Sequence, residues 1–421
     1  MAIQRVPGSP AGQANAAARR MGIAALAALV TAYALGPMAT QILTPAVPFV
    51  HRDLAIPMAA AQTLISLAFA TIAVMTVVYG PLSDRFGRRP LILAGTSLFC
   101  VGSLVAGLAP TADLLILGRM VQAAGSSAGL VLTRTIVHDV YGRERSGQVI
   151  AYLTVVMIFV PMLSPLAGGI LLDHIGWRAI FGMCAAIGLA AFATLAICLP
   201  ETNLARRADF GLRPTLESFG ALARDPSYVG PALFFSLVMA TFFATQAALP
   251  YLIVEVHGGT ATEYGMWFAV ACAFYVAGNY ASGRWGGKVE RGRLILACGI
   301  GCLATGVAGL AAASLIEWST AAVFVPTIVL YFFGAVAIAP VQAEAVAAQP
   351  ERSGAASGLM SGIQMAIGAG VVQLVGLTHN GTAFPMFAAL IACAALAIIV
   401  FGSAYAVKPI REVSISARNA S

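Results

Sequence analysis

Residues 80–90, Gly80-Pro81-Leu82-Ser83-Asp84-Arg85-Phe86-Gly87-Arg88-Arg89-Pro90, form a densely charged stretch between two long apolar runs. Neither residues 58–79 nor residues 91–110 contain a charged side chain. Each run is long enough to cross a bilayer, because a spanning helix needs about 20 apolar residues. The stretch is therefore predicted to be a tight loop at a membrane face. Its three arginines place that face in the cytoplasm.

The composition of the whole chain agrees with this interpretation. Of its 421 residues, 59% are hydrophobic and only 10% are charged, whereas soluble domains carry about 25% charged residues. The sequence therefore predicts a protein that lies mostly inside the bilayer. Its net charge of +7 does not indicate a nucleic-acid partner, because the basic residues sit in short segments beside the apolar runs, as the positive-inside rule expects.

The apolar runs predict an all-α membrane protein with twelve transmembrane helices. The predicted spans are residues 21–46, 58–80, 91–110, 114–133, 147–171, 179–199, 229–252, 265–283, 294–314, 319–342, 355–377 and 384–407. With these spans, 21 of the 24 lysines and arginines fall in segments on one side. We therefore expect both termini to be cytoplasmic, in a multi-pass protein of the inner (plasma) membrane of a bacterium.

A polar segment in the middle of the chain divides the spans six and six. The second half echoes the first, since Gly80 precedes Asp84 by four residues and Gly286 precedes Glu290 by four, each after the second span of its half. Such repeats are typical of transporters whose halves move about a midplane site. The predicted parts are a cytoplasmic tail (1–20), a six-helix half (21–199), a cytoplasmic linker (200–228), a second six-helix half (229–407) and a second tail (408–421).

The cysteines and histidines do not indicate a metal site, a cofactor or an enzyme. All seven cysteines fall inside apolar runs, where small buried thiols are common. Cys298 and Cys302 share a helix face, but no third ligand accompanies them. The sequence also lacks a nucleotide-binding loop. We expect no metal, no cofactor and no catalytic residues.

The charged stretch and the twelve spans resemble the major facilitator superfamily, and more narrowly its drug:proton antiporters of the bicyclomycin and chloramphenicol resistance type. The resemblance covers the whole chain. Its most specific element is the family's loop pattern G-x-x-x-D-R-x-G-R-[RK]. That pattern is matched by Gly80, Asp84, Arg85, Gly87, Arg88 and Arg89.

The resemblance implies that these residues gate the cytoplasmic side. Arg88 or Arg85 would pair with Asp139 or Glu144 and hold that side closed until the protein opens inward. The alternative is that the charges only fix topology, although Asp84 is not needed for that.

Span 4 contains Arg119, Gln122 and Gly125, which match the family's pattern R-x-x-Q-x-x-G. Placing an arginine inside a span costs about 2.5–3.5 kcal/mol on insertion scales. The resemblance implies a role in proton coupling. The alternative is that Arg119 lies near the outer end and extends toward water or Asp113.

Span 5 contains Pro161, Pro165, Gly168 and Gly169, close to the antiporter pattern G-P-x-x-G-G, with Ser164 in place of its first glycine. Prolines kink a helix, and paired glycines allow close helix packing. We expect a hinge, the alternative being an ordinary kinked membrane helix.

Gln41 is the main departure from the family, which usually has an acidic residue there. A glutamine can hydrogen-bond a substrate but cannot carry a proton. No acidic residue lies well inside a predicted span. The nearest are Asp113, at the outer end of span 4, and Glu344, at the inner end of span 10.

Several uncharged polar and aromatic residues fall inside the predicted spans and are candidates to line a cavity for neutral or amphiphilic ligands. Each is also explained by a hydrogen bond between helices. These candidates are Tyr33, Gln41, Gln246, Tyr275, Asn279 and Gln364.

The sequence thus predicts an exporter of small amphiphilic molecules that works by alternating access, with proton antiport as its driving force. A uniporter or uptake permease for a metabolite is the second hypothesis, which Gln41 favours. A receptor or scaffold that has lost transport is the third. The expected partners are a small-molecule substrate, protons and the lipid bilayer, and the chain is expected to be a monomer.

Overall fold

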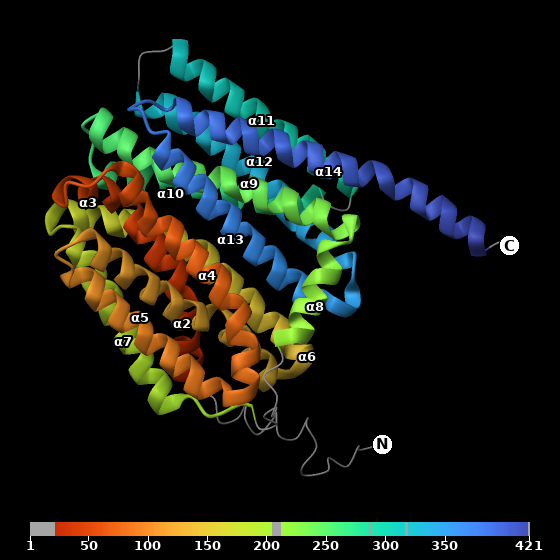
Figure 1. Ribbon diagram of the computed structural model, residues 1–421, viewed down its shortest axis with the longest axis horizontal. Helices are drawn as coiled ribbons and strands as arrows, with labels where there is room; N and C mark the ends of the chain where they lie inside the picture. The colour runs from red at the N-terminus through yellow and green to blue at the C-terminus, as the bar shows by residue number, and fades with distance from the viewer. Residues whose placement is uncertain (1–21, 204–211, 286–287, 316–318, 420–421) are drawn as a thin grey trace. The chain divides into compact units, whose positions relative to one another are not determined.

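The computed structural model describes residues 22–203, 212–285, 288–315 and 319–419 (Figure 1). All regular structure within these ranges is helical. The helices that precede the charged stretch or include it are α2 (Ile23–Leu43), η1 (Thr44–Ala46), α3 (Val47–Asp53) and α4 (Met58–Phe86). After it come α5 (Arg88–Leu108), α6 (Ala112–His174), α7 (Trp177–Cys198), α8 (Leu212–Ala223), α9 (Pro226–Tyr251), η2 (Leu252–Val256), α10 (Ala261–Trp285), α11 (Arg291–Leu315), α12 (Thr320–Ala347), η3 (Pro350–Arg352), α13 (Ser353–Leu377) and α14 (Phe384–Asn419).

Ten helical segments in the described part are long and apolar enough to cross a membrane. The other two predicted spans, residues 147–171 and 265–283, lie within α6 and α10. The all-α membrane fold class predicted from the sequence is confirmed. The predicted tail at residues 1–20 lies outside the described residues.

The charged stretch is helical, where the sequence analysis expected a loop. α4 continues through Pro81 to Phe86, and α5 begins at Arg88, so Gly87 alone separates the two helices. Gly87 has φ of 100°, a conformation that residues with a Cβ rarely adopt. The expectation was wrong because dense charge marks the end of the bilayer core, whereas a helix can continue into the headgroup region and water.

α6 holds both span 4 and span 5, although the sequence predicted a loop between residues 133 and 147. Val137 and Leu153 pack in one cluster with Tyr33, yet 16 residues of straight helix would separate them by about 24 Å. Likewise, Arg119 near the start of α6 and Gly168 near its end both contact the last turns of α2. The axis of α6 therefore reverses between Val137 and Leu153, which gives two antiparallel legs.

The legs of α6 pack closely against α2 and α5 through small residues. A Cβ added at Gly95 or Gly125 would overlap the facing helix, and one added at Gly129 would overlap the backbone of Ala32 in α2. Lipid tails are as apolar as leucine, so helices in a bilayer associate through such close packing rather than through exclusion from water. These glycines determine how near the helices of this bundle approach.

The chain divides into two compact units. Unit 1 comprises the chain up to Leu43 together with Val74–Leu212, and unit 2 comprises Thr44–Ala73 and Arg213–Ser421. In unit 1, α2 and α5 each pack against α6 and α7. In unit 2, α9 and α11 each pack against α12 and α14, and α9 also packs against α13 (Figure 1). The neighbour pattern of the first, third and sixth spans thus repeats, as the internal sequence repeat predicts. The boundaries at residues 200–228 stay a prediction, and α8 lies in that segment.

Unit 2 includes η1, α3 and the first part of α4, which are held to its other helices by polar contacts. The Gln62 amide donates to the carbonyl of Ala247 at 2.7 Å. Gln373 of α13 donates to the carbonyl of Ala59 at 3.1 Å and accepts from Ser66 at 2.9 Å. Polar side chains therefore bond across these helices, to backbone carbonyls and in one case to another side chain, the kind of contact that holds helices together in a bilayer.

We predict that Gly95→Ala lowers the melting temperature of the purified protein in detergent, because its Cβ would overlap Ala128 and the carbonyl of Gly125. Overpacking of this kind costs about 1–3 kcal/mol. The control is Gly182→Ala in α7, where an added Cβ meets no neighbour and the helix gains from losing a glycine. Equal melting temperatures for the two variants would contradict the packing account.

Candidate functional site

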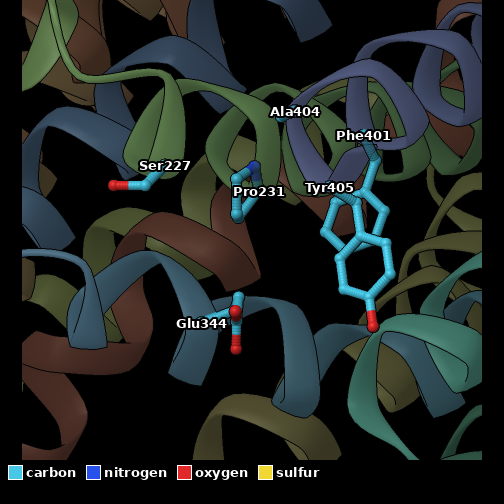
Figure 2. A pocket seen from close by; sticks show the side chains of 6 residues that line it. All are labelled: Ser227, Pro231, Glu344, Phe401, Ala404 and Tyr405. Atoms are coloured by element: carbon cyan, nitrogen blue, oxygen red, sulfur yellow. The ribbon is translucent and has the colours of Figure 1, made fainter. Parts of the chain in front are cut away.

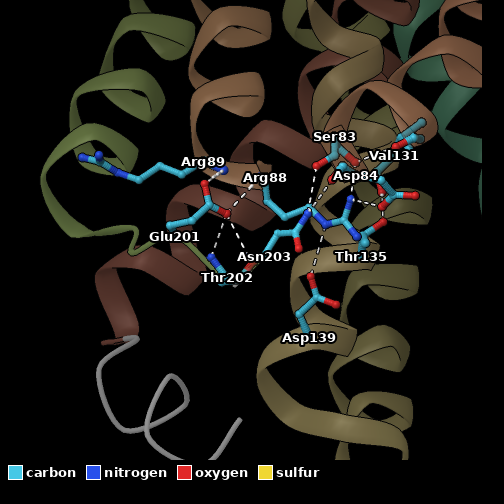
Figure 3. Close-up of polar contacts among 11 residues, drawn as sticks. Ser83, Asp84, Arg88, Arg89, Val131, Thr135, Asp139, Glu201, Thr202 and Asn203 are labelled. Atoms are coloured by element: carbon cyan, nitrogen blue, oxygen red, sulfur yellow. Dashed lines mark hydrogen bonds and ion pairs between the residues drawn. The ribbon is translucent and has the colours of Figure 1, made fainter. Parts of the chain in front are cut away.

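Arg88, the first residue of α5, makes polar contacts with both neighbouring helices (Figure 3). Its Nη1 donates to the Asp84 carboxylate at 2.6 Å and to the Ser83 hydroxyl, both on α4. Its Nε donates to the Asp139 carboxylate of α6 at 3.2 Å. One guanidinium therefore ties the end of α4 and the start of α5 to the end of the first leg of α6, and we call Arg88, Ser83, Asp84 and Asp139 the arginine latch.

The guanidinium of Arg88 is planar, so its N–H donors point in fixed directions toward the residues of the latch. Only 11% of the Arg88 side chain is exposed, compared with 40% for Asp84 and 26% for Asp139. Charge-assisted bonds in a partly dehydrated place are about twice as strong as neutral ones. Of the pairings that the sequence suggested, the one with Asp139 is made by Arg88. Arg85 is exposed and its guanidinium lies 5.3 Å from the ring centre of Phe86. The side chain of Glu144 lies outside the described residues.

Glu201 satisfies the start of α5, a role that the sequence analysis did not assign. Its carboxylate accepts from the backbone amides of Arg88 at 3.0 Å and Arg89 at 3.3 Å (Figure 3). It also accepts from the amides of Thr202 and Asn203, each at 2.9 Å. A carboxylate at a helix N-terminus is stabilised by unpaired amides and by the helix dipole.

The segment after α7 makes further contacts at the same place. The Asn203 amide donates to the carbonyls of Ser83 at 3.2 Å and Asp84 at 3.1 Å. Arg89 donates to the carbonyl of Ala196 at 2.7 Å. Two features of the sequence could have indicated this capping role. Glu201 follows a span directly, and α5 begins after Gly87, which has no side chain to cap the helix. These contacts connect the latch to the end of the sixth span.

Arg119 is buried in unit 1, where it contacts span 1. Its side chain is 2% exposed, and it donates to the carbonyl of Ala39 at 3.4 Å and to the Gln122 amide oxygen. Gln122 in turn donates to Ser103 of α5 at 2.8 Å. An arginine extending to water would be exposed, so the burial favours a polar network between helices. Asp113 is exposed in the first turn of α6.

The candidate hinge lies in the second leg of α6. Pro161 and Pro165 are inside the helix, and Gly168 and Gly169 are buried. A Cβ at Gly168 would overlap the carbonyl of Ile42 in α2. The small residues therefore permit close contact with span 1, and the role as a hinge stays a prediction.

The cavity candidates are divided between the two units. In unit 1, Tyr33 is buried and accepts hydrogen bonds from Arg134, while Gln41 is half-buried on α2. In unit 2, Gln246 is buried on α9 and Gln364 is half-buried on α13. Each unit thus contains some of the polar residues that the sequence suggested as cavity candidates.

An aromatic cluster in unit 2 was missed by the sequence analysis, apart from Tyr275. The Phe242 ring lies 4.5 Å from the Tyr331 ring and 5.7 Å from the Tyr275 ring, both edge-on. The Tyr331 hydroxyl lies 3.3 Å from the Thr245 hydroxyl, and Asn279 donates to the carbonyl of Tyr275 at 3.0 Å. The spacing of these aromatic residues along their helices does not show whether they face one another or the lipid. The sequence alone therefore could not reveal the cluster.

Glu344 lies near the C-terminal end of α12 and lines a pocket (Figure 2). The other lining residues are Ser227, Pro231, Phe401, Ala404 and Tyr405. The Tyr405 hydroxyl donates to Glu290, near the start of α11. Glu344 thus lies at an end of its span, and its location on the cytoplasmic side stays a prediction. In the described residues, no group of three histidines, cysteines or acids is arranged to hold a metal ion.

We predict that Glu201→Ala lowers the melting temperature in detergent, because the amides of Arg88 and Arg89 lose their acceptor. Loss of such a cap costs about 1–2 kcal/mol. Glu201→Gln keeps one acceptor oxygen and should lose less. Glu351→Ala, at an exposed residue of η3, is the matched control, and a Glu201→Ala protein as stable as this control would refute the capping role.

Comparison with known proteins agrees with this arrangement. The sequence profile described as Major Facilitator Superfamily matches residues 29–373. The chain is 30% identical to the chloramphenicol resistance protein of Pseudomonas aeruginosa over 69% of each chain. It is 29% identical to multidrug resistance protein D of Escherichia coli (strain K12), over 84% of this chain and 88% of that one.

Solved structures show the same fold. A mutant of the peptide transporter POT aligns with a TM-score of 0.75 and 13% identity, over 94% of this chain and 98% of that one. The twelve-helix architecture of two halves predicted from the sequence agrees with this likeness. The chain belongs to the Major Facilitator Superfamily, in the branch of the chloramphenicol and multidrug resistance proteins.

Proposed function

We propose that this protein exports small amphiphilic organic molecules across the bacterial inner membrane by alternating access, in exchange for protons. The observation that carries the proposal is the arginine latch, in which one guanidinium joins α4, α5 and the first leg of α6 through Ser83, Asp84 and Asp139. The names of the relatives, chloramphenicol and multidrug resistance proteins, support export of drug-like molecules.

The latch is suited to gating because its bonds are few, polar and concentrated at helix ends. A contact made of charge-assisted bonds can exchange its partners for water at the membrane face, whereas a packed apolar seam cannot. In this proposal the latch stabilises one arrangement of the helix ends, and its rearrangement accompanies opening of the cytoplasmic side. The expected monomer, the cytoplasmic location of both termini and the absence of enzymatic activity belong to the same proposal.

Proton coupling has support from the resemblance to antiporters, and Gln41 favours the second candidate, a facilitator without coupling. A glutamine cannot exchange a proton at physiological pH. In the proposal the proton-binding group is one of the remaining candidates, Asp113 or Glu344, with Arg119 adjusting its environment. Replacing each acid by its amide separates these candidates.

The test uses inside-out vesicles that contain the protein, energised to an acidic interior and followed with a pH-sensitive dye. We expect at least one drug of a chemically diverse panel to dissipate the gradient only when the protein is present. If tracer flux runs downhill while no compound moves protons, the protein is a facilitator. If neither occurs, transport is refuted.

We predict that Asp84→Asn reduces this transport at least tenfold with normal membrane insertion, because the neutral amide weakens the charge-assisted bond to Arg88 by roughly 1.4 kcal/mol or more. The control is Glu351→Gln, which removes one exposed charge elsewhere and should transport normally. Unchanged transport by the Asp84→Asn protein would show that the charges serve topology alone.

A further inference from the structure

Arg134 lies within α6, although its position in the sequence suggested a cytoplasmic loop. It belongs to the apolar segment Ala112–Tyr141 that is able to cross a membrane. Its Nε and Nη2 donate to the Tyr33 hydroxyl at 2.9 and 2.6 Å, and its guanidinium carbon lies 5.4 Å from the centre of the Tyr33 ring. The side chain therefore reaches span 1.

The positions of Tyr33 on α2 and of Asp139 on α6 together limit the depth of this guanidinium. α2 begins at Ile23, so Tyr33 lies ten residues along it, or about 15 Å from its start. The hydrocarbon core of a bilayer is about 30 Å thick. Arg134 also lies only five residues, or about 7.5 Å, before the latch residue Asp139 along α6, so its guanidinium lies inside the apolar segment but within about two helical turns of the latch. A snorkelling arginine at the inner end of a span would extend the opposite way, toward the headgroups.

The residue is exposed, while its phenol partner is 1% exposed. An exposed charge at this depth is tolerated facing a water-filled cavity and is strongly disfavoured in lipid. In the described part of the chain no carboxylate forms an ion pair with Arg134. Asp139, the nearest acid along the same helix, is held by Arg88. The positive charge is thus not neutralised by the described side chains around it.

Tyr33 orients the guanidinium and leaves donors available. The phenol is fixed by packing against Val137 and Leu153, with Val30 and Leu130 beside them. Two of the five guanidinium N–H groups are used by the phenol oxygen, so three remain for a ligand. A held guanidinium loses less entropy on binding than a free one, and the partly exposed Val30 and Leu130 can contact a hydrocarbon body.

We propose that Arg134, oriented by Tyr33, recognises an anionic group of the substrate, so that the transported molecules are amphiphiles with one carboxylate or similar anion on an apolar body. This rests on the proposed export function and specifies its substrate class. It also agrees with Gln41, since a site without a carboxylate on span 1 does not select cations.

The test measures binding to the full-length protein in nanodiscs of zwitterionic lipid by isothermal titration calorimetry. The probes are naphthalene-2-carboxylate, 4-butylbenzoate and octanoate, each compared with its neutral amide, and the cation 2-naphthylmethylammonium. We expect the carboxylates to bind at least about tenfold more tightly than their amides, since hydrogen bonds to a charged group contribute about 1.5–3 kcal/mol. The cation should bind most weakly.

Variants test whether Arg134 is responsible for the preference for carboxylates over their amides. Arg134→Gln should abolish it, Arg134→Lys should keep part of it, and Tyr33→Phe should reduce it, because the guanidinium loses its support. Arg224→Gln, at an exposed residue, is the control for loss of one positive charge. Melting temperatures establish that each variant is folded.

Three results would overturn the proposal: no carboxylate binding at millimolar concentration, equal binding of acids and amides, or a preference that survives in Arg134→Gln. Binding does not depend on transport. An anion preference that depends on Arg134 in a protein that moves no compound would therefore refute export while supporting anion recognition.

Discussion

The bilayer core offers no hydrogen-bond partner to a polar group, and the placement of the few charges in this chain follows from that constraint. Arg88 and Glu201 lie at helix ends, where water and unpaired amides are available. Arg119, inside a span, is surrounded by the carbonyl of Ala39 and the amide of Gln122. Close packing through glycine serves the same constraint, because it replaces the exclusion from water that drives folding elsewhere.

Much of the fold could be predicted from the sequence because the signals involved are strong and local. Long uncharged runs indicate spans regardless of tertiary structure, and the distribution of arginines indicates orientation. The repeat of glycine and acid at Gly80 and Gly286 was visible as spacing, and the packing pattern of the two units reflects it. Asp139 could be proposed as a partner of the charged stretch from charge and topology.

The remaining features depend on contacts between segments far apart in the sequence. Glu201 carries no pattern that reveals its role at the start of α5, because the amides of Arg88 and Arg89 lie more than one hundred residues earlier. Arg134 was assigned to a loop because charge was taken as the end of span 4. In the structure Arg134 lies in α6, and its side chain reaches Tyr33 on α2. The reversal within α6 was predicted by the division into spans 4 and 5, whereas the helical conformation of the segment between them was not.

The capping of α5 by Glu201 also has a consequence for biosynthesis. Arg88 leaves the ribosome 113 residues before Glu201, a delay on the order of ten seconds at ordinary elongation rates. During that interval the turn between the second and third spans lacks the carboxylate that caps α5. Glu201 supplies this carboxylate once the sixth span has been synthesised. The contacts within unit 1 can therefore form before the second half has been translated, whereas residues 44–73 wait for α9 and α13 of unit 2.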